Sequence, residues 1–125
     1  MQRILIVEDS ETMRSLLASS LEELDVPVKI SEAASGFEAL RLLPREDFDL
    51  VVTDINMPDI NGLELLSFVR NNDRFRSMPV VIVSTEGSDR DRDKGLELGA
   101  DAYLVKPFDP GALREVVSGL LARTR

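Results

Sequence analysis

The chain has 125 residues and a formal net charge of −8 at pH 7, and it contains neither cysteine nor histidine. This length suits one domain with a single core, and the missing residue types exclude disulfides, zinc sites of the usual kind and histidine-based catalysis, which leaves carboxylates, hydroxyls and lysine for chemistry. The negative charge argues against a nucleic-acid partner, because such binding needs clustered lysine and arginine.

The first predicted strand, residues 4 to 7, is a purely aliphatic run, as expected for a strand that is buried on both faces of a parallel sheet. It is followed by Glu8 and Asp9. Four apolar residues are too few for a secretory signal or a membrane span, so we expect a cytoplasmic protein without membrane insertion. Ser10 is placed to cap a helix that continues towards Pro27. The apolar residues of this helix recur at helical spacing: Met13, Leu16, Leu17, Leu21 and Leu24.

The middle of the chain predicts two strands and two helices. Residues 28 to 34 have mixed polarity, which is typical of a strand at a sheet edge, and a short helix follows from Gly36 to Pro44. Residues 50 to 53 begin with a short apolar run that indicates a buried strand. This strand ends in a polar turn that contains Asp54, Asn56, Pro58, Asn61 and Gly62. Three apolar residues then mark a third helix: Leu63, Leu66 and Val69.

The last part of the chain predicts two further strands and two further helices. Residues 80 to 83 form the most hydrophobic strand, which stops at Ser84. Residues 86 to 98 alternate in charge and predict a weakly held helix. Its main apolar anchors are expected to be Leu96 and Leu98. A fifth strand over residues 102 to 105 ends at Lys106. The last helix carries one apolar stripe, formed by Leu113, Val116, Val117, Leu120 and Leu121.

Five strands that alternate with five helices predict an α/β fold, a doubly wound parallel sheet with helices on both faces. In such a sheet the carboxyl ends of the strands gather along one edge, where ligands bind. The residues at these ends are Glu8, Asp9, Asp54, Ser84, Thr85 and Lys106. Each of them alone is explained as a turn residue, a helix cap or a solvated lysine. Together, three carboxylates suit a hard divalent ion, and hydroxyl and ammonium groups suit phosphate oxygens.

Four short motifs lie at these strand ends: ILIVED at residues 4–9, DINMP at 54–58, VST at 83–85 and KPF at 106–108. In these motifs, and over the whole of residues 1–125, the chain resembles the receiver domain of bacterial two-component response regulators, in particular the CheY-like single-domain type. The resemblance implies a flavodoxin-like sheet with the strand order 2-1-3-4-5 and a role in phosphorelay signalling such as chemotaxis.

The resemblance implies that Asp54 accepts a phosphoryl group. Glu8 and Asp9 would hold Mg²⁺ together with Asp54, and Asn56 would lend the metal its backbone carbonyl. The donor would be a phosphohistidine on a separate sensor histidine kinase or phosphotransfer protein, since this chain has no histidine. On this interpretation the protein is not an enzyme acting on other substrates, because it catalyses only its own phosphorylation and dephosphorylation.

The resemblance also implies roles in signal output. Ser84 and Lys106 would bind the phosphoryl oxygens, and Ser84 would act with Tyr103 as the switch. Asn56 and Glu86 would lie beside the path of the hydrolytic water and keep the phosphorylated state short-lived. A downstream target protein would dock on the face made by the fourth helix, fifth strand and fifth helix. The candidate contacts on that face are Arg90, Arg92, Tyr103 and Glu115.

Two positions depart from the commonest family pattern. Glu8 stands where many receivers have aspartate, and Ser84 stands where threonine is also common. Both replacements keep the functional group, a carboxylate in the first case and a hydroxyl in the second.

Three other functions compete with this interpretation. A Mg-dependent phosphohydrolase of the haloacid dehalogenase type places its nucleophile after the first strand, with a second aspartate two residues later. Here the first strand ends in Glu8 and Asp9, and Asp54 is followed by Asn56, so neither position fits. A flavodoxin-like nucleotide or flavin binder needs a glycine- or hydroxyl-rich phosphate loop, and the segment EDSETM has no glycine. A degenerate receiver that acts only as a protein-interaction module lacks support, because all the site residues are present.

Overall fold

A computed structural model describes residues 1–85 and 89–123. Strands and helices alternate along the chain: β1 (Gln2–Val7), α1 (Glu11–Glu22), β2 (Val28–Ala33), α2 (Gly36–Leu42), the short 3₁₀ helix η1 (Leu43–Arg45), β3 (Leu50–Thr53), α3 (Gly62–Asn71), β4 (Val80–Ser84), α4 (Asp89–Glu97), β5 (Ala102–Val105) and α5 (Pro110–Arg123). The five strands are parallel and form one sheet in the order β2-β1-β3-β4-β5. The predicted doubly wound sheet and its strand order are therefore confirmed.

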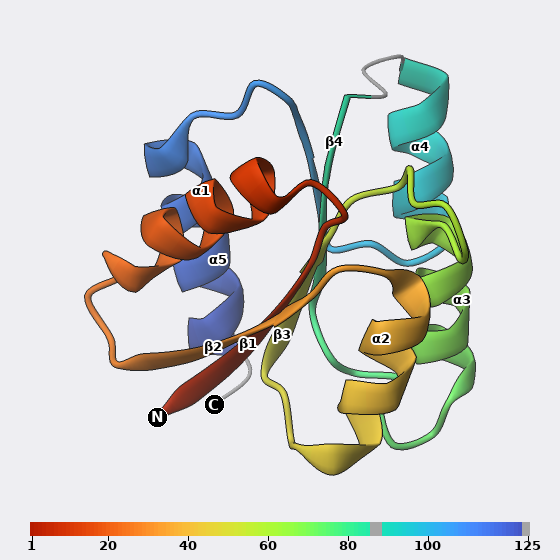
Figure 1. Ribbon diagram of the computed structural model, residues 1–125, viewed down its shortest axis with the longest axis horizontal. Coiled ribbons are helices and arrows are strands. Elements are labelled where there is room, and N and C mark those ends of the chain that lie inside the picture. The colour runs from red at the N-terminus through yellow and green to blue at the C-terminus, as the bar shows by residue number, and fades with distance from the viewer. Residues whose placement is uncertain (86–88, 124–125) are drawn as a thin grey trace.

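The sheet separates two hydrophobic cores. Helices α1 and α5 cover one face, and α2, α3 and α4 cover the other (Figure 1). Because side chains alternate along a strand, Leu5 and Val7 enter the core beneath α2 and α3, while Ile4 and Ile6 enter the core beneath α1 and α5. All four are fully buried, which explains why β1 is aliphatic without interruption.

Helix α1 begins as predicted and ends earlier than predicted. The Ser10 hydroxyl oxygen accepts a hydrogen bond from the Met13 backbone N–H at 3.2 Å, so Ser10 is the N-cap. The helix stops at Glu22, which leaves Leu24 outside it, and Leu16 is 45% exposed. The apolar stripe of α1 that packs on the sheet is consequently narrower than the sequence spacing indicated. Leu17 and Leu21 provide most of its buried contact.

The predicted anchors of α4 are wrong. Leu96 is 42% exposed and Leu98, which lies beyond the end of the helix, is 38% exposed. The buried residue of α4 is Gly95. A Cβ atom there would lie 3.1 Å from the Ile82 side chain and 3.2 Å from the Tyr103 ring. The helix approaches β4 and β5 through its smallest residue, so its contact with the sheet does not show as an apolar stripe.

Arg70 at the end of α3 joins the segments that lead into β4 and β5. Its guanidinium donates hydrogen bonds to three backbone carbonyls, those of Arg76, Met78 and Gly99. It also pairs with the Asp101 carboxylate at 2.9 Å, and the same carboxylate oxygen accepts from the Val80 backbone N–H. Because several backbone groups depend on one side chain, Arg70 is a structural clamp at the amino-terminal edge of the sheet.

The longest described helix, α5, has 14 residues. No helix within the described ranges combines the length and the apolar character needed to cross a membrane. The buried residues of α5 follow the predicted stripe: Leu113, Val117, Leu120 and Leu121. Val116 is partly buried at the margin of this stripe.

Replacing Arg70 tests the clamp. We expect Arg70→Met to lower the free energy of unfolding by about 2–4 kcal/mol, because it removes charged hydrogen bonds to carbonyls that are partly shielded from water. The matched control is Arg76→Met, which removes an exposed arginine paired only with Asp73 and should change stability by no more than about 0.5 kcal/mol. Urea denaturation measures both, and equal effects of the two substitutions would contradict the assignment.

Candidate functional site

The polar residues predicted to gather at the carboxyl edge of the sheet do so. Glu8 and Asp9 follow β1, Asp54 follows β3, and Lys106 follows β5. One carboxylate oxygen from each of Glu8, Asp9 and Asp54 lies within 4.8 Å of the other two. Three oxygen donors so close together are suited to a hard divalent cation. This chain therefore contains an acidic cluster that could hold a metal ion.

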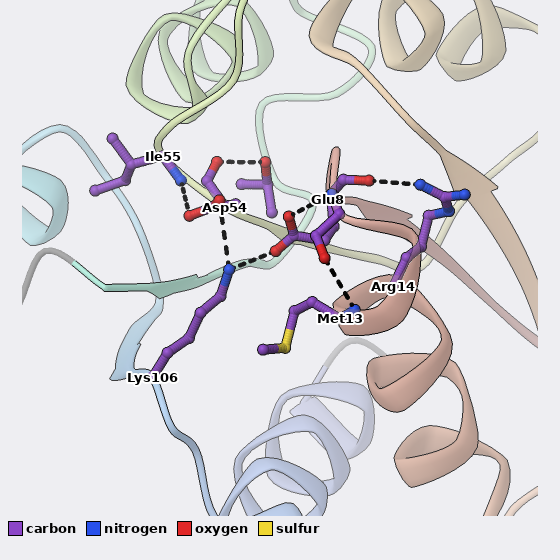
Figure 2. Close-up of polar contacts among 8 residues, drawn as sticks. Glu8, Met13, Arg14, Asp54, Ile55 and Lys106 are labelled. Carbon is purple, nitrogen blue, oxygen red and sulfur yellow. Dashed lines mark hydrogen bonds and ion pairs between the residues drawn. The ribbon is translucent and has the colours of Figure 1, made fainter.

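The Lys106 ammonium lies between two of these acids (Figure 2). Its Nζ is 2.5 Å from Glu8 Oε1 and 3.4 Å from Asp54 Oδ2. All three side chains are at least nine-tenths buried, so water screens their interactions only weakly. The cluster contains three carboxyl groups and Lys106 pairs with two of them, so one ammonium leaves an excess of negative charge for a cation to neutralise.

The backbone around Asp54 directs its carboxylate. The Asp54 N–H donates to the Val7 carbonyl at 3.0 Å, which continues the ladder between β3 and β1 beyond the last residue of β3. Asp54 Oδ1 accepts a hydrogen bond from the Ile55 backbone N–H at 2.8 Å (Figure 2). The other oxygen, Oδ2, faces Lys106. The side chain is thus held in one orientation, with Oδ2 towards the positive charge.

Gly62 closes the loop that follows Asp54. Its N–H donates to the Ile55 carbonyl at 2.8 Å, so the loop returns to the place where it started. A Cβ atom at this position would lie 2.0 Å from the Asp54 carbonyl oxygen, which no side chain could tolerate. Sequence analysis identified Gly62 only as a turn residue, because its contact with Asp54 spans eight positions and carries no local signal.

Glu8 is the most deeply buried acid of the cluster. Its Oε2 accepts from the Ser10 backbone N–H at 3.0 Å, and its backbone carbonyl accepts from the Arg14 guanidinium at 2.9 Å. Burial raises the pKa of the Glu8 carboxyl above its ordinary value of 4.5, and the charge of Asp54 adds to this effect. The hydrogen bonds from Lys106 and Ser10 oppose the increase without cancelling it. The ionised form of Glu8 therefore lowers the stability of the folded protein until a cation binds.

This cost predicts a pH dependence in the absence of divalent metal. Because the pKa of Glu8 is raised in the folded protein, the folded state binds a proton more tightly than the unfolded chain does. The wild type should therefore lose stability relative to Glu8→Gln as the pH rises through 4.5 and beyond the raised pKa. We expect the urea midpoint of Glu8→Gln to exceed that of the wild type at about pH 7.5 with a chelator, and to converge with it below about pH 4. A wild-type advantage that grows with pH would refute this interpretation.

Ser84 and Tyr103 face the same side of the sheet. Ile82 pairs with Tyr103 and Ser84 pairs with Val105 in the parallel register of β4 and β5. Since paired residues share a face and side chains alternate, all four lie on the face of the sheet that α3 and α4 cover, where Ile82 and Tyr103 pack in the core and Val105 is exposed. Ser84 is fully buried and Tyr103 is partly buried against Gly95 of α4. The register therefore places the predicted switch pair two residues apart along one surface.

Ser84 is also tied to Lys106 through the backbone. The Lys106 N–H donates to the Ser84 carbonyl at 2.8 Å, and the peptide bond that follows Lys106 is cis. The ends of β4 and β5 consequently stay paired up to the residues that lie nearest the acidic cluster.

The remaining predicted residues lie in different places. Asn56 is exposed in the loop after Asp54, and Glu86 lies outside the described residues. Arg90 and Arg92 are exposed on α4, where Arg92 pairs with Asp89.

Glu115 is exposed on α5. It lines a hollow together with Glu23, Asp25 and Arg114, on the side of α5 that meets the end of α1. Its neighbour Arg114 bonds the Glu23 carboxylate and the Ser20 carbonyl, which turns this side of α5 towards α1. The predicted contact of Glu115 with a target protein on the surface formed by α4, β5 and α5 stays a prediction.

Comparison with known proteins agrees with this geometry. The family model for the response regulator receiver domain matches residues 4–118. A chemotaxis protein CheY homolog of Campylobacter jejuni is 39% identical over 120 residues, which cover 95% of this chain and 92% of the relative. Among solved structures, the receiver domain of the Francisella response regulator 1452 has a TM-score of 0.90 at 30% identity and complete coverage of both chains. The chemotaxis response regulator CheY4 of Vibrio cholerae has a TM-score of 0.86 at 32% identity, with 96% of this chain and 98% of that chain covered.

The chain belongs to the response regulator receiver family. Its similarity to CheY homologues over nearly their whole length makes it a CheY-like receiver. The acidic cluster of Glu8, Asp9 and Asp54 lies where such a domain needs its phosphorylation site.

Proposed function

We propose that this receiver is activated by phosphorylation of Asp54 in a Mg²⁺-dependent reaction. The observation that carries the proposal is the position of the Asp54 carboxylate, which is buried, lies beside two further acids and faces the Lys106 ammonium at 3.4 Å. A nucleophilic carboxylate needs positive charge on both sides before it can approach an anionic phosphoryl group. Lys106 supplies one such charge, and the acidic cluster offers a binding place for the other.

Glu8, Asp9 and Asp54, with the backbone carbonyl of Asn56, would hold the metal. Bound Mg²⁺ supplies charge neutralisation between the carboxylate and the incoming phosphoryl oxygens. A carboxylate oxygen of Asp54 forms the new bond to phosphorus as the phosphorus–nitrogen bond of a phosphohistidine breaks, and the electron pair of that bond leaves with the imidazole. The phosphohistidine belongs to a sensor histidine kinase or a phosphotransfer protein.

Two further side chains act on the phosphoryl group. Lys106 pairs with one of its oxygens, and Ser84 donates a hydrogen bond to another once it leaves its buried position. Asn56 is exposed at the entrance of the site, where it can orient an attacking water, and Glu86 is assigned the same role. The phosphorylated state is consequently short-lived. The protein acts catalytically only on its own phosphorylation and dephosphorylation.

The test is phosphorylation by acetyl phosphate in Mg²⁺, read as the mass of the intact protein. We expect the wild type to gain one phosphoryl group and Asp54→Asn to gain none, because the amide keeps the size of the side chain but has no nucleophilic charge. Asp9→Asn should fail by a different route, since raising the Mg²⁺ concentration should partly restore its reaction.

The matched control is Asp73→Asn. Asp73 is an exposed aspartate far along the chain whose side chain pairs only with Arg76, and its replacement should leave the reaction unchanged. If Asp54→Asn is phosphorylated at the wild-type rate, the nucleophile is misassigned. If the wild type gains no phosphoryl group, the chain is a degenerate receiver that works only through protein contacts.

We further propose that phosphorylation changes the surface formed by α4, β5 and α5, where a downstream target protein docks. A phosphoryl group adds about −1.5 to −2 charges, and it draws Ser84 towards the site. Tyr103, on the same face of the sheet, follows into the space that Ser84 leaves. Arg90, Arg92, Tyr103 and Glu115 are the contacts proposed for the target on this surface.

Amide hydrogen exchange with and without beryllium fluoride, a phosphoryl mimic, tests the output surface. We expect altered exchange at residues 82–85 and 102–106, because the backbone of β4 and β5 carries Ser84, Tyr103 and Lys106. Changes confined to residues 10–45 would exclude this surface. The Asp54→Asn protein serves as the control, since beryllium fluoride needs the Asp54 carboxylate to bind.

A further inference from the structure

The amino terminus of α2 is capped by a residue from the loop after Asp54. The Asp59 carboxylate accepts two hydrogen bonds, from the Gly36 backbone N–H at 3.2 Å and from the Phe37 backbone N–H at 2.9 Å. These partners lie 23 and 22 positions away in the sequence. Two free N–H groups at a helix start normally find a local acceptor or water, so a distant carboxylate is an additional connection between two elements.

Helix α2 does not need Asp59 in order to begin. Ser35 is its N-cap, and the Ser35 hydroxyl oxygen accepts from the Glu38 N–H at 3.1 Å. The Ser35 carbonyl accepts from the Ala39 N–H at 3.1 Å. A local cap of this kind is sufficient to stabilise the first turn of a helix. The Asp59 hydrogen bonds therefore serve the loop more than they serve the helix.

The contact between loop and helix is also close sterically. A Cβ atom on Gly36 would lie 2.7 Å from both the Cβ and the carbonyl oxygen of Ile60. Glycine at this position allows the backbone of α2 to lie directly against the residue that follows Asp59. The carboxylate and the glycine thus define one seat for the loop on the helix.

Helix α2 is a firm support for this seat. Its residue Ala39 and the adjoining Leu43 of η1 are fully buried in the same core as Leu5 and Val7 of β1. The Phe37 N–H is the main reason why the pKa of Asp59 is lowered to about 2, so the carboxylate stays charged at any pH above about 4. The connection consequently persists over the whole pH range in which the protein is expected to act.

The loop also has polar contacts near its ends. At its base the Gly62 N–H bonds the Ile55 carbonyl, and at its far end Asn61 and Glu64 form a capping box with α3. Asn56 lies between these points, on the stretch that Asp59 connects to α2. The seat on α2 therefore fixes the part of the loop around Asp59 from outside the acidic cluster.

We propose that Asp59 is a positioning residue for the metal site. It holds the loop that presents the Asn56 backbone carbonyl, so part of the affinity for Mg²⁺ comes from two hydrogen bonds made outside the site. This inference rests on the proposed function, in which that carbonyl is a metal ligand. Outer contacts that orient a metal ligand commonly have a measurable effect on metal affinity.

The test compares Mg²⁺ affinity, measured by calorimetry at about 0.15 M salt, in the wild type and three variants. We expect Asp59→Ala to weaken binding by about threefold or more. Asp59→Asn, which keeps one acceptor oxygen but no charge, should weaken it less. Ser35→Ala is the matched control, because it removes the local cap of the same helix and leaves the connection to the loop intact. Its Mg²⁺ affinity should equal that of the wild type.

Amide exchange in metal-free protein provides a second readout. Asp59→Ala should speed exchange at residues 55–58, whereas Ser35→Ala should affect only the first turn of α2. Unchanged affinity in Asp59→Ala, equal losses in Asp59→Ala and Ser35→Ala, or equal losses in Asp59→Ala and Asp59→Asn would each overturn the inference. The first outcome means that the loop needs no support, the second that general loosening is responsible, and the third that charge alone matters. If the wild type itself binds no Mg²⁺, the proposed function fails instead.

Discussion

The pairing of the Lys106 ammonium with Glu8 and Asp54 is the interaction on which this structure depends. It joins the ends of β1, β3 and β5, and it does so in surroundings where water screens charge only weakly. Three carboxylates that lie so close together repel one another, and a neighbouring cation reduces this repulsion. Lys106 permits the cluster to exist in the folded protein, yet it neutralises only part of the charge. The pairing with Lys106 therefore stabilises the folded protein and still leaves enough negative charge for the site to bind a second cation.

The fold and most of the site could be predicted because their signals are local. Aliphatic runs such as residues 4–7 and 80–83 identify strands that are buried on both faces, and alternation with helices makes the sheet parallel. Once the sheet is parallel, the residues that follow its strands must meet at one edge. Glu8, Asp54 and Lys106 could be grouped on this basis, although they are separated by up to 98 positions. The strand order came from the family resemblance, and the structure confirms it.

The features that could not be predicted depend on how helices are rotated and on contacts between distant segments. Leu96 is exposed and Gly95 is buried because α4 approaches Ile82 and Tyr103 closely at Gly95, and a glycine gives no hydrophobic signal. The hollow that Glu115 lines with Glu23 and Asp25 is formed between distant segments, so the spacing within α5 does not indicate it. The bonds from Asp59 to α2 involve backbone N–H groups, which every residue type shares, so nothing in the sequence marks Gly36 as a partner.

The Arg70 clamp makes the amino-terminal ends of the strands structurally different from their carboxyl ends. At the amino-terminal edge one guanidinium bonds the carbonyls of Arg76, Met78 and Gly99. The segments that lead into β4 and β5 are therefore connected through a single side chain. The acidic cluster lies at the opposite edge, beyond the last residues of the strands. Gly99 lies two residues after the end of α4, which places the clamp near the carboxyl end of that helix. Because Arg70 holds the segment just beyond the carboxyl end of α4, a displacement near Ser84 is expected to move the amino-terminal end of this helix more than its carboxyl end.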